Sequence, residues 1–344
     1  MKSRIDRLWY QQRRPLWLLW PLARLFTLLA LWRKGRLRGR AYRSPLPVLV
    51  VGNITVGGTG KSPFTAWLAD FVRYKGWQPV ILSRGYGGRT HHYPQLVTPG
   101  SDAAECGDEP VMLAQQTGCP VVVDPRRDRA AEWVLQQGLG TLLICDDGLQ
   151  HYRLARDIEF VLFDGARGAG NQAPLPVGPL REPLRRLRQA DYCIATGEPV
   201  HPSWSSIRQQ VEDVHQVTQQ PSQLRHLHSD RVRPLQWLSG QTVNAVAGIA
   251  NPERFFDSLM QLGAKVIPHP FSDHHPFSAS DFDLAHGPIV MTAKDAVKCR
   301  SVAPDNVWVL DIMAMPDAAL GRSLTRQLAA LATSAETPSG DSHG

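Results

Sequence analysis

Short apolar runs rich in valine and isoleucine recur along the first half of the chain. They cover residues 47–54, 79–83, 121–124 and 141–147. Residues 63–74 carry apolar side chains at helical spacing, and the other gaps are long enough for helices. Strands that alternate with helices form parallel sheets, which bind ligands at the carboxyl ends of their strands. The pattern predicts an α/β fold with a doubly wound, mainly parallel sheet.

The second half of the chain contains a second, smaller α/β pattern over residues 243–312. It follows residues 199–235, which are rich in Gln, His, Ser and Pro and have little periodicity, as in a connecting segment. These changes predict five parts: an N-terminal helix with a basic flank (1–43), a core (44–198), a connecting segment (199–235), a C-terminal α/β lobe (236–333) and a disordered tail (334–344).

The N-terminal part holds a mostly apolar stretch, residues 15–32, which Pro21 and Arg24 interrupt. A membrane-spanning helix needs about 20 apolar residues, and an arginine near its centre costs about 2.5–3.5 kcal/mol. Tryptophan prefers the lipid headgroup layer. Four of the ten tryptophans lie in this part: Trp9, Trp17, Trp20 and Trp32. We therefore favour a helix that lies in the membrane interface over one that spans the bilayer.

Charge is distributed unevenly along the 344 residues. Residues 1–43 hold 12 of the 38 Lys and Arg but only one acid, Asp6, which gives this part +11 and leaves −4 for the rest. A folded domain without excess positive charge argues against nucleic-acid binding. The five cysteines are widely spaced and contain no CxxC pair, so they favour a reducing cytosol over a disulfide framework or a zinc site.

Two other interpretations of the N-terminal part remain open. A signal peptide also combines a basic start with an apolar stretch, but here no small-residue cleavage site follows. An ordinary core helix with a solvated basic face is the second alternative. We favour a peripheral anchor, because cations that flank an apolar helix bind the anionic lipids of a cytoplasmic leaflet.

A glycine-rich loop lies between the first predicted strand and the helix at 63–74. In this context, backbone N–H groups converge on the phosphates of ATP, a lysine reaches the β- and γ-phosphates, and a Ser or Thr binds Mg²⁺. Lys61 and Ser62 stand in those positions, although Thr55 replaces the first glycine of the general motif. The predicted nucleotide-binding residues are Thr55, Val56, Gly57, Gly58, Thr59, Gly60, Lys61 and Ser62.

Asp146 and Asp147 end the apolar run at 141–147. An acid at the end of a buried strand beside a phosphate loop holds Mg²⁺ directly or through water, as in the Walker B arrangement. Two adjacent acids are also compatible with a merely polar strand end. We predict that Ser62, Asp146 and Asp147 form the Mg²⁺ site.

Four motifs follow one another in order: residues 52–63 (GNITVGGTGKSP), 83–87 (SRGYG), 107–110 (GDEP) and 146–151 (DDGLQH). With LPVGPLREP at 175–183, FSDH at 271–274 and TAKD at 292–295, this set resembles the tetraacyldisaccharide 4'-kinase family of Gram-negative bacteria. The resemblance extends over roughly residues 10–325.

The resemblance implies phosphoryl transfer from ATP, with Mg²⁺, to the 4'-hydroxyl of a tetraacylated glucosamine disaccharide 1-phosphate. It also implies work at the cytosolic face of the inner membrane, on a lipid that cannot leave the bilayer. The predicted fold is then P-loop NTPase-like, with a second α/β lobe and a membrane-associated N-terminal helix. The predicted partners are the lipid substrate and the inner membrane, without nucleic acid.

The resemblance also implies roles for two residues. Asp108 corresponds to the family's base for the acceptor hydroxyl, and His274 to the histidine that acts with it. With Lys61, they form the predicted catalytic set, and we expect the first two to meet across a cleft between the lobes. By itself, Asp108 before Pro110 is more typical of a helix N-cap.

Two further groups of residues allow alternative interpretations. His269, His274 and His275 lie close together, but their spacing fits no common metal-binding helix. The basic residues Arg181, Arg185, Arg186 and Arg188 are compatible with a solvated face or with contacts to the substrate 1-phosphate or lipid headgroups.

Two other functions compete with the lipid kinase. A membrane-recruited P-loop ATPase switch with a protein partner would share the loop and the anchor, but it has no need of a second lobe with Asp273 and His274. A cytosolic small-molecule kinase would leave the N-terminal part without a purpose.

Overall fold

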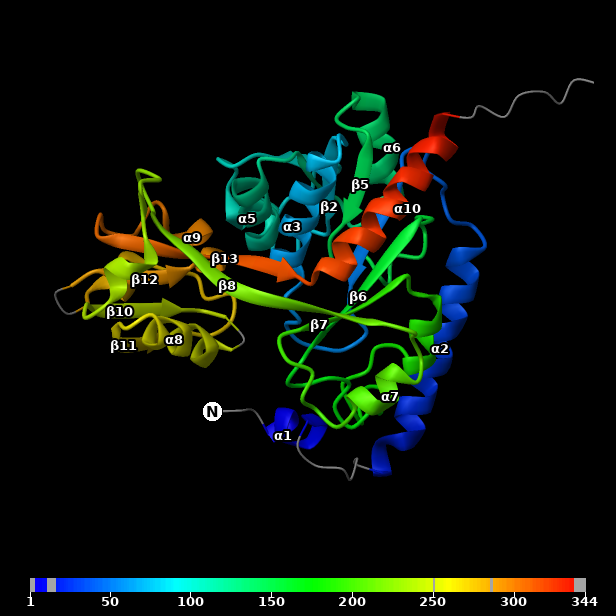
Figure 1. The fold of residues 1–344 in the computed structure, drawn as a ribbon, viewed down its shortest axis with the longest axis horizontal. Helices are drawn as coiled ribbons and strands as arrows, with labels where there is room; N and C mark the ends of the chain where they lie inside the picture. Colours follow the sequence, from blue (N-terminus) through cyan, green and yellow to red (C-terminus); the bar gives the residue numbers. More distant parts are fainter. Residues whose placement is uncertain (1–3, 11–16, 250, 285–286, 337–344) are drawn as a thin grey trace, which may run out of the picture.

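The computed structural model describes residues 4–10, 17–249, 251–284 and 287–336. Figure 1 shows two lobes of unequal size connected by two long strands, with the N-terminal helices along the larger lobe. The strands are β1 (Val48–Gly52), β2 (Pro79–Ser83), β3 (Gln95–Val97), β4 (Val121–Val123), β5 (Leu142–Cys145), β6 (Ile158–Asp164), β7 (Tyr192–Thr196), β8 (Val214–His226), β9 (Val232–Arg233), β10 (Thr242–Ala247), β11 (Lys265–Pro270), β12 (Ile289–Thr292) and β13 (Val307–Pro316).

The helices surround these strands. They are α1 (Arg4–Tyr10), α2 (Trp20–Arg38), α3 (Lys61–Tyr74), α4 (Ala103–Cys106), α5 (Asp108–Thr117), α6 (Arg127–Gln137), α7 (Trp204–Arg208), α8 (Pro252–Gln261), α9 (Ala293–Cys299) and α10 (Ala318–Glu336). Short 3₁₀ turns are η1 (Trp17–Leu19), η2 (Leu184–Gln189), η3 (Leu235–Leu238) and η4 (Ala279–Phe282).

The strands form one continuous sheet, in the order β11-β10-β12-β13-β8-β7-β6-β1-β5-β2-β4-β3, and β9 pairs with β8 outside this order. Strands β8 to β4 of this order are mutually parallel, and so are β11 to β13. The antiparallel pair β13 and β8 connects the two parallel parts. The predicted α/β fold with a doubly wound, mainly parallel sheet is therefore confirmed.

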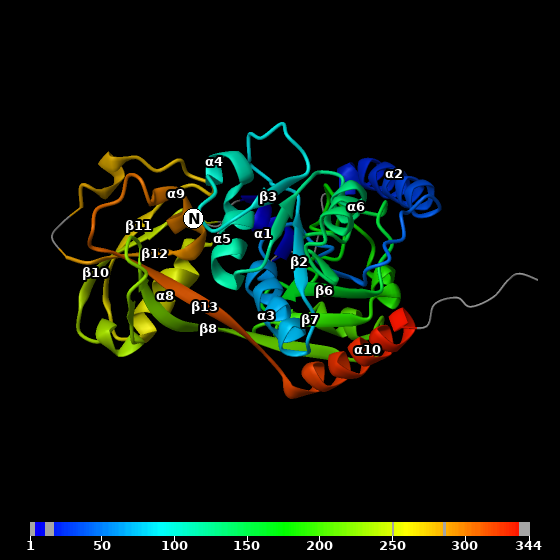
Figure 2. The same ribbon diagram turned by 90° about the horizontal axis from the view of Figure 1, so that it is seen from above.

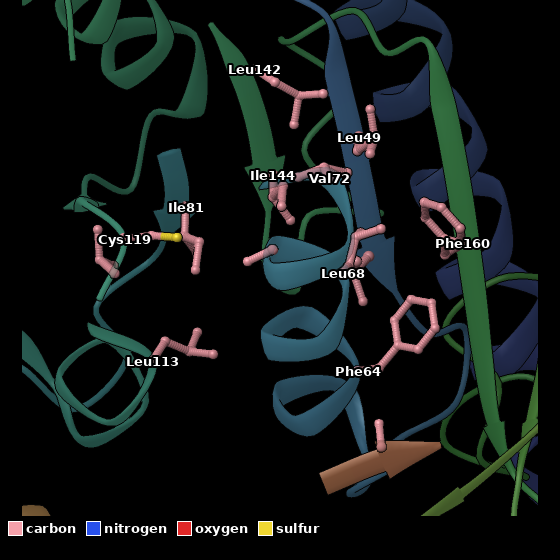
Figure 3. Packing of buried hydrophobic residues seen from close by; sticks show 14 of the residues in the cluster. Leu49, Phe64, Leu68, Val72, Ile81, Leu113, Cys119, Leu142, Ile144 and Phe160 are labelled. Atoms are coloured by element: carbon pink, nitrogen blue, oxygen red, sulfur yellow. The ribbon is translucent and has the colours of Figure 1, made fainter. Parts of the chain in front are cut away.

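The larger lobe packs α3 against the centre of this sheet (Figure 3). Phe64, Leu68 and Val72 recur every four residues on α3, so all three face the same side and are fully buried. Phe64 lies 5.4 Å, between ring centroids, from Phe160 of β6. This packing holds the first turn of α3, and with it the glycine-rich loop, against the carboxyl end of β1.

The connecting segment predicted for 199–235 is more ordered than its sequence suggests. It contains α7 and β8, and β8 pairs with β7 on one side and β13 on the other. Most side chains of β8 are only partly buried on both faces, so the strand lacks the alternation of polar and apolar residues that would reveal it.

The predicted C-terminal lobe extends to residue 333, but the last helix within this range does not belong to it. Helix α10 returns to the larger lobe (Figure 2), where Leu320, Leu324 and Leu328 are buried in the same cluster as Phe64 and Phe160. The C-terminal lobe therefore lacks α10, because β13 leads the chain back across the molecule. Of the predicted disordered tail, residues 334–336 belong to α10, and 337–344 lie outside the described residues.

Helix α2 lies along the outside of the larger lobe. Its one buried residue, Ala23, packs on Ala173 and Val177, whereas Leu28 and Trp32 are 65% and 62% exposed. In the described part of the chain, no helix is long and apolar enough to cross a bilayer. Helix α2 thus has an apolar face that the described residues leave exposed.

We expect Leu324→Ala to destabilise the larger lobe by about 2–5 kcal/mol, because it opens a cavity under α10. Urea unfolding followed by circular dichroism measures the change, with the exposed Arg322→Ala on the same helix as control. Similar midpoints for both variants would contradict the packing of α10 on the core.

Candidate active site

The glycine-rich loop occupies residues 55–60, between β1 and the first turn of α3. Gly57 and Gly60 have φ of 109° and 76°, values that side chains other than glycine rarely adopt. A Cβ at Gly60 would also lie 2.9 Å from the Thr196 methyl carbon. Lys61 and Ser62 begin α3, so backbone N–H groups and two side chains gather at a helix N-terminus, which favours bound phosphate.

Neighbouring segments hold this loop in place. The N–H of Val56 donates to the carbonyl of Pro179 (2.9 Å), and the N–H of Arg181 donates to the carbonyl of Ile54 (2.7 Å). From the N-terminal part, the Tyr10 hydroxyl donates to the Val56 carbonyl (3.0 Å). Sequence reasoning missed Tyr10, because a contact over 46 positions has no local signal.

A cluster of polar side chains connects three of the sequence motifs. Gln150 Nε2 donates to the Asn53 carbonyl (3.1 Å) and to Glu182 Oε1 (3.0 Å). Glu182 also accepts from Tyr152, and it lies 3.7 Å from the Nζ of Lys34 on α2. Helix α2 is thereby connected to the glycine-rich loop through charged and polar side chains.

Asp146 and Asp147 lie at the carboxyl end of β5, facing the loop. Lys61 Nζ is 3.4 Å from Asp147 Oδ1, and Thr65 of α3 donates to Asp146 Oδ1 at 2.9 Å. Asp147 has φ of 46°, which is a strained value for a residue other than glycine. Strained backbone of this kind is frequent at functional sites. The structure thus brings the predicted catalytic lysine close to two of the three predicted Mg²⁺ ligands, Asp146 and Asp147.

The two carboxyl groups have opposite pKa shifts. Burial, followed by the nearby charges of Glu109 and Asp147, raises the pKa of Asp146 to about 7. Burial also acts to raise the pKa of Asp147, but the Lys61 ammonium and Arg181 outweigh it and lower this pKa below its usual value. Asp147 therefore stays ionised at neutral pH, whereas Asp146 exchanges a proton there.

Asp108 and His274 meet between the two lobes, as the sequence analysis expects. His274 Nδ1 lies 3.0 Å from Asp108 Oδ2, although 166 positions separate the residues. Asp108 is not the N-cap of α5: Gly107 holds that position, and the Asp108 side chain faces the other lobe. The contact excludes the cap interpretation, and the catalytic role stays a prediction.

Two lysines of α9 border this pair, and the sequence analysis did not single them out. Lys298 Nζ lies 3.7 Å from Asp108 Oδ2 and 3.1 Å from Asp295 Oδ1. Lys294 Nζ lies 3.3 Å from His274 Nε2. A sequence signal for these lysines exists. Lys294 belongs to the TAKD motif and Lys298 follows it, and four residues separate them, so both lie on the same face of the helix.

The other histidines near His274 do not converge on a metal. His269 contacts Asn244, His275 contacts Asp281, and His274 contacts Asp108, so the three rings face different partners. Within the described residues, no group of three or more His, Cys, Asp or Glu side chains could hold a metal ion by themselves. A Mg²⁺ ion that takes phosphate oxygens and water needs fewer protein ligands.

The basic residues at 181–188 do not form a uniform solvated face. Arg186 is buried, donates to Glu159 at 2.6 Å and lies 3.6 Å from Glu182. Arg188 is exposed and donates to Gln210. Arg181 is half-buried beside the glycine-rich loop and acts on Asp147, which leaves it the best placed of the group for a phosphate.

The loop region fits a bound Mg²⁺–nucleotide. Within the part of the chain that the structure describes, Asn53 Oδ1 and Thr59 Oγ1 are buried without a hydrogen-bond partner. Buried polar atoms are costly when unpaired, so these two atoms indicate a missing polar ligand. The donor set adds an ammonium, a hydroxyl and two carboxyl groups from Lys61, Ser62, Asp146 and Asp147, which suits phosphate and a hard cation.

The chain is similar to known proteins in sequence and in fold. The sequence profile of the family described as LpxK, tetraacyldisaccharide-1-P 4'-kinase, matches residues 15–329. The tetraacyldisaccharide 4'-kinase of Tolumonas auensis is 43% identical over 330 residues, covering 94% of this chain and 97% of that protein. The kinase of the same name from Pseudomonas aeruginosa is 45% identical over 322 residues, covering 92% and 94%. The crystal structure of the "apo" form of LpxK from Aquifex aeolicus in complex with ATP has a TM-score of 0.74 and 25% identity, covering 91% of this chain and 98% of that one.

We expect the apparent Mg²⁺ affinity of the enzyme to fall about tenfold between pH 8 and pH 6. Mg²⁺ requires the ionised carboxylate, and the pKa of Asp146 of about 7 leaves most of this group protonated at pH 6. Titrations of nucleotide hydrolysis or transfer with Mg²⁺ at saturating ATP, at several pH values, measure the change. Asp146→Asn should lose the pH dependence, and an unchanged slope in this variant would contradict the assignment.

Proposed function

The chain belongs to the tetraacyldisaccharide-1-phosphate 4'-kinase family, and we propose that its glycine-rich loop and the Asp108–His274 pair carry out the family's reaction. The enzyme transfers the γ-phosphoryl group of ATP to the 4'-hydroxyl of a tetraacylated disaccharide 1-phosphate, with Mg²⁺, in lipid A biosynthesis. The observation that supports these residue roles best is the 3.0 Å contact between Asp108 of the larger lobe and His274 of the smaller lobe.

The larger lobe binds ATP in this proposal. Backbone N–H groups of residues 55–60 surround the phosphates, and Lys61 moves from Asp147 to the β- and γ-phosphate oxygens. Ser62, Asp146 and Asp147 would hold Mg²⁺, and the bound cation would supply positive charge beside the phosphates. Because Asp147 is ionised and Asp146 titrates near neutrality, Asp146 would give up its proton when it binds the cation.

The second half of the reaction centre lies between the lobes, where the larger lobe contributes Asp108 and the smaller lobe contributes His274. A sugar hydroxyl is a weak nucleophile at neutral pH, so a carboxylate within hydrogen-bond reach accepts its proton as transfer proceeds. We assign this role to Asp108, at the start of α5, with His274 holding the carboxylate in position. Arg181 is the candidate contact for a substrate phosphate.

Because the lipid substrate stays in the bilayer, the enzyme must work at the membrane surface. Helix α2 carries exposed leucines and Trp32 on its outer side, and its basic flank suits anionic headgroups. We place this face in the cytoplasmic leaflet of the inner membrane, in peripheral or monotopic contact. The proposed domain roles follow: residues 1–43 bind the membrane, the larger lobe binds ATP, and the smaller lobe completes the acceptor site.

The switch alternative has no support in this geometry. A membrane-recruited ATPase needs no histidine from a second lobe against an aspartate beside the nucleotide site, and here His274 and Asp108 form that contact. The proposal therefore keeps a single function.

We expect Asp108→Ala and His274→Ala each to lower kcat by about 10²- to 10⁴-fold, because each removes part of one proton-accepting unit. The double variant should lose little more than the worse single one, since groups that act together are not additive. Single-turnover transfer to the tetraacyl disaccharide in detergent micelles, at saturating ATP, measures all three. Multiplicative losses would show that the two residues act independently.

We expect the triple change Leu25→Gln, Leu28→Gln and Leu29→Gln to weaken binding to anionic vesicles by roughly 100-fold, because the side chains that enter the interface become polar. Activity on vesicle-embedded substrate should fall, and activity on a short-chain soluble analogue should stay within about twofold. These substitutions are preferable to deleting residues 1–40, which would also remove the contact of Tyr10 with the glycine-rich loop.

The matched control for the triple variant replaces exposed apolar residues elsewhere: Leu96→Gln, Leu135→Gln and Val200→Gln. These positions lie outside α2, so vesicle binding should be unchanged. Equal losses on vesicle and soluble substrates for the α2 variant would mean that α2 serves the catalytic lobe and not the membrane.

A further inference from the structure

Lys294 contacts both lobes at the reaction centre. Its Nζ lies 3.2 Å from Asp273 Oδ1 in its own lobe and 3.6 Å from Glu109 Oε1 in the larger lobe. It also lies 3.3 Å from Nε2 of His274. The Lys294 side chain is 19% exposed, so solvent screens these contacts only in part.

The contact with His274 has a chemical consequence. A lysine ammonium carries three N–H donors and no acceptor, so a ring nitrogen facing it must present its lone pair. Nε2 is then unprotonated, and the ring proton of the neutral imidazole lies on Nδ1. Nδ1 is the nitrogen that faces Asp108 at 3.0 Å, so its N–H donates to Oδ2 of that carboxylate.

We propose that Lys294 is a positioning residue that selects the Nδ1–H tautomer of His274 and so directs the imidazole N–H at Asp108. This inference rests on the proposed roles of Asp108 and His274 in catalysis. In the other tautomer, Nε2–H would point at the ammonium and the Nδ1 lone pair at the carboxylate, which makes two unfavourable contacts in place of two hydrogen bonds.

The backbone of the FSDH segment is consistent with a ring held in one orientation. His274 has φ of 60°, a left-handed conformation that costs free energy in a residue with a side chain. Its ring also lies 5.5 Å, between centroids, from that of Tyr86 in the SRGYG motif. With the ring placed by these features, Lys294 determines which nitrogen carries the proton.

Lys298, the second lysine of α9, has different contacts and therefore provides a control for Lys294. Lys298 carries the same charge one turn further along α9, but its Nζ lies near Asp108, Asp295 and the ring of Phe277. Removing it therefore changes the charge of the same helix by the same amount without removing the contact to Nε2. Lys298→Met is therefore the matched control for Lys294→Met when the tautomer of His274 is measured.

The experiment is ¹⁵N NMR of the full-length enzyme in detergent micelles, with ¹⁵N-labelled histidine. The His274 signals are identified by their loss in His274→Gln, among the 12 histidines of the chain. We expect the wild type and Lys298→Met to show a protonated Nδ1 and an unprotonated Nε2. Lys294→Met should show a mixture of tautomers or the Nε2–H form, and Lys294→Arg should restore the wild-type pattern because it keeps a donor.

Kinetics on the same preparations separate this inference from the proposed function. We expect Lys294→Met to lower kcat by about 10- to 100-fold, as loss of a partner that orients a functional group does, with recovery in Lys294→Arg. A tautomer change without loss of kcat supports the inference and counts against the catalytic role of His274. An unchanged tautomer in Lys294→Met overturns the inference, whatever the rate. Lys294→Ala repeats the measurement should the Met variant fail to fold.

Discussion

The antiparallel pairing of β8 with β13 determines where the smaller lobe, and with it His274, lies relative to the larger lobe. These two strands join the two parallel parts of the sheet, from Trp308 opposite His226 to Pro316 opposite Val217 (Figure 1). The smaller lobe is attached to the larger one through this ladder, and it carries His274 to Asp108. A shift in register, which the pairing already shows once between Asp311 and Ile312, alters the twist of such a ladder and hence the position of the lobe.

Charge complementarity brings the two lobes together at their facing ends. The larger lobe contributes carboxylates at the start of α5, Asp108 and Glu109, and the smaller lobe contributes Lys294 and Lys298 from α9. Partly buried pairs of this kind are worth more than exposed ones, because less water screens them. The same groups that join the two lobes surround the proposed proton acceptor, so the lobe interface and the reaction centre depend on one set of ion pairs.

The N-terminal part contacts the segments that hold the glycine-rich loop. Tyr10 donates to the glycine-rich loop, and Lys34 of α2 reaches Glu182, which connects through Gln150 to Asn53 at the end of β1. Helix α2 thus combines the exposed apolar face that we propose contacts lipid with polar side chains that support the glycine-rich loop. In this proposal, a substrate held in the bilayer meets a site whose position relative to α2 is fixed by polar contacts.

Local sequence determined the elements that depend on neighbouring residues. The strand, glycine-rich loop and helix around Lys61, and the acids that end β5, follow from short-range patterns, because φ preferences, helix periodicity and strand-end chemistry act over a few positions. The motifs in order also indicated that Asp108 and His274 act together. Their contact, the return of α10 to the larger lobe, and the strand β8 within a segment without periodicity were decided by tertiary structure. The roles of Lys294 and Lys298 could be assigned only from the folded protein, because they depend on which atoms face each ammonium group. Those atoms belong to His274 and Asp108, which are distant from the two lysines in sequence.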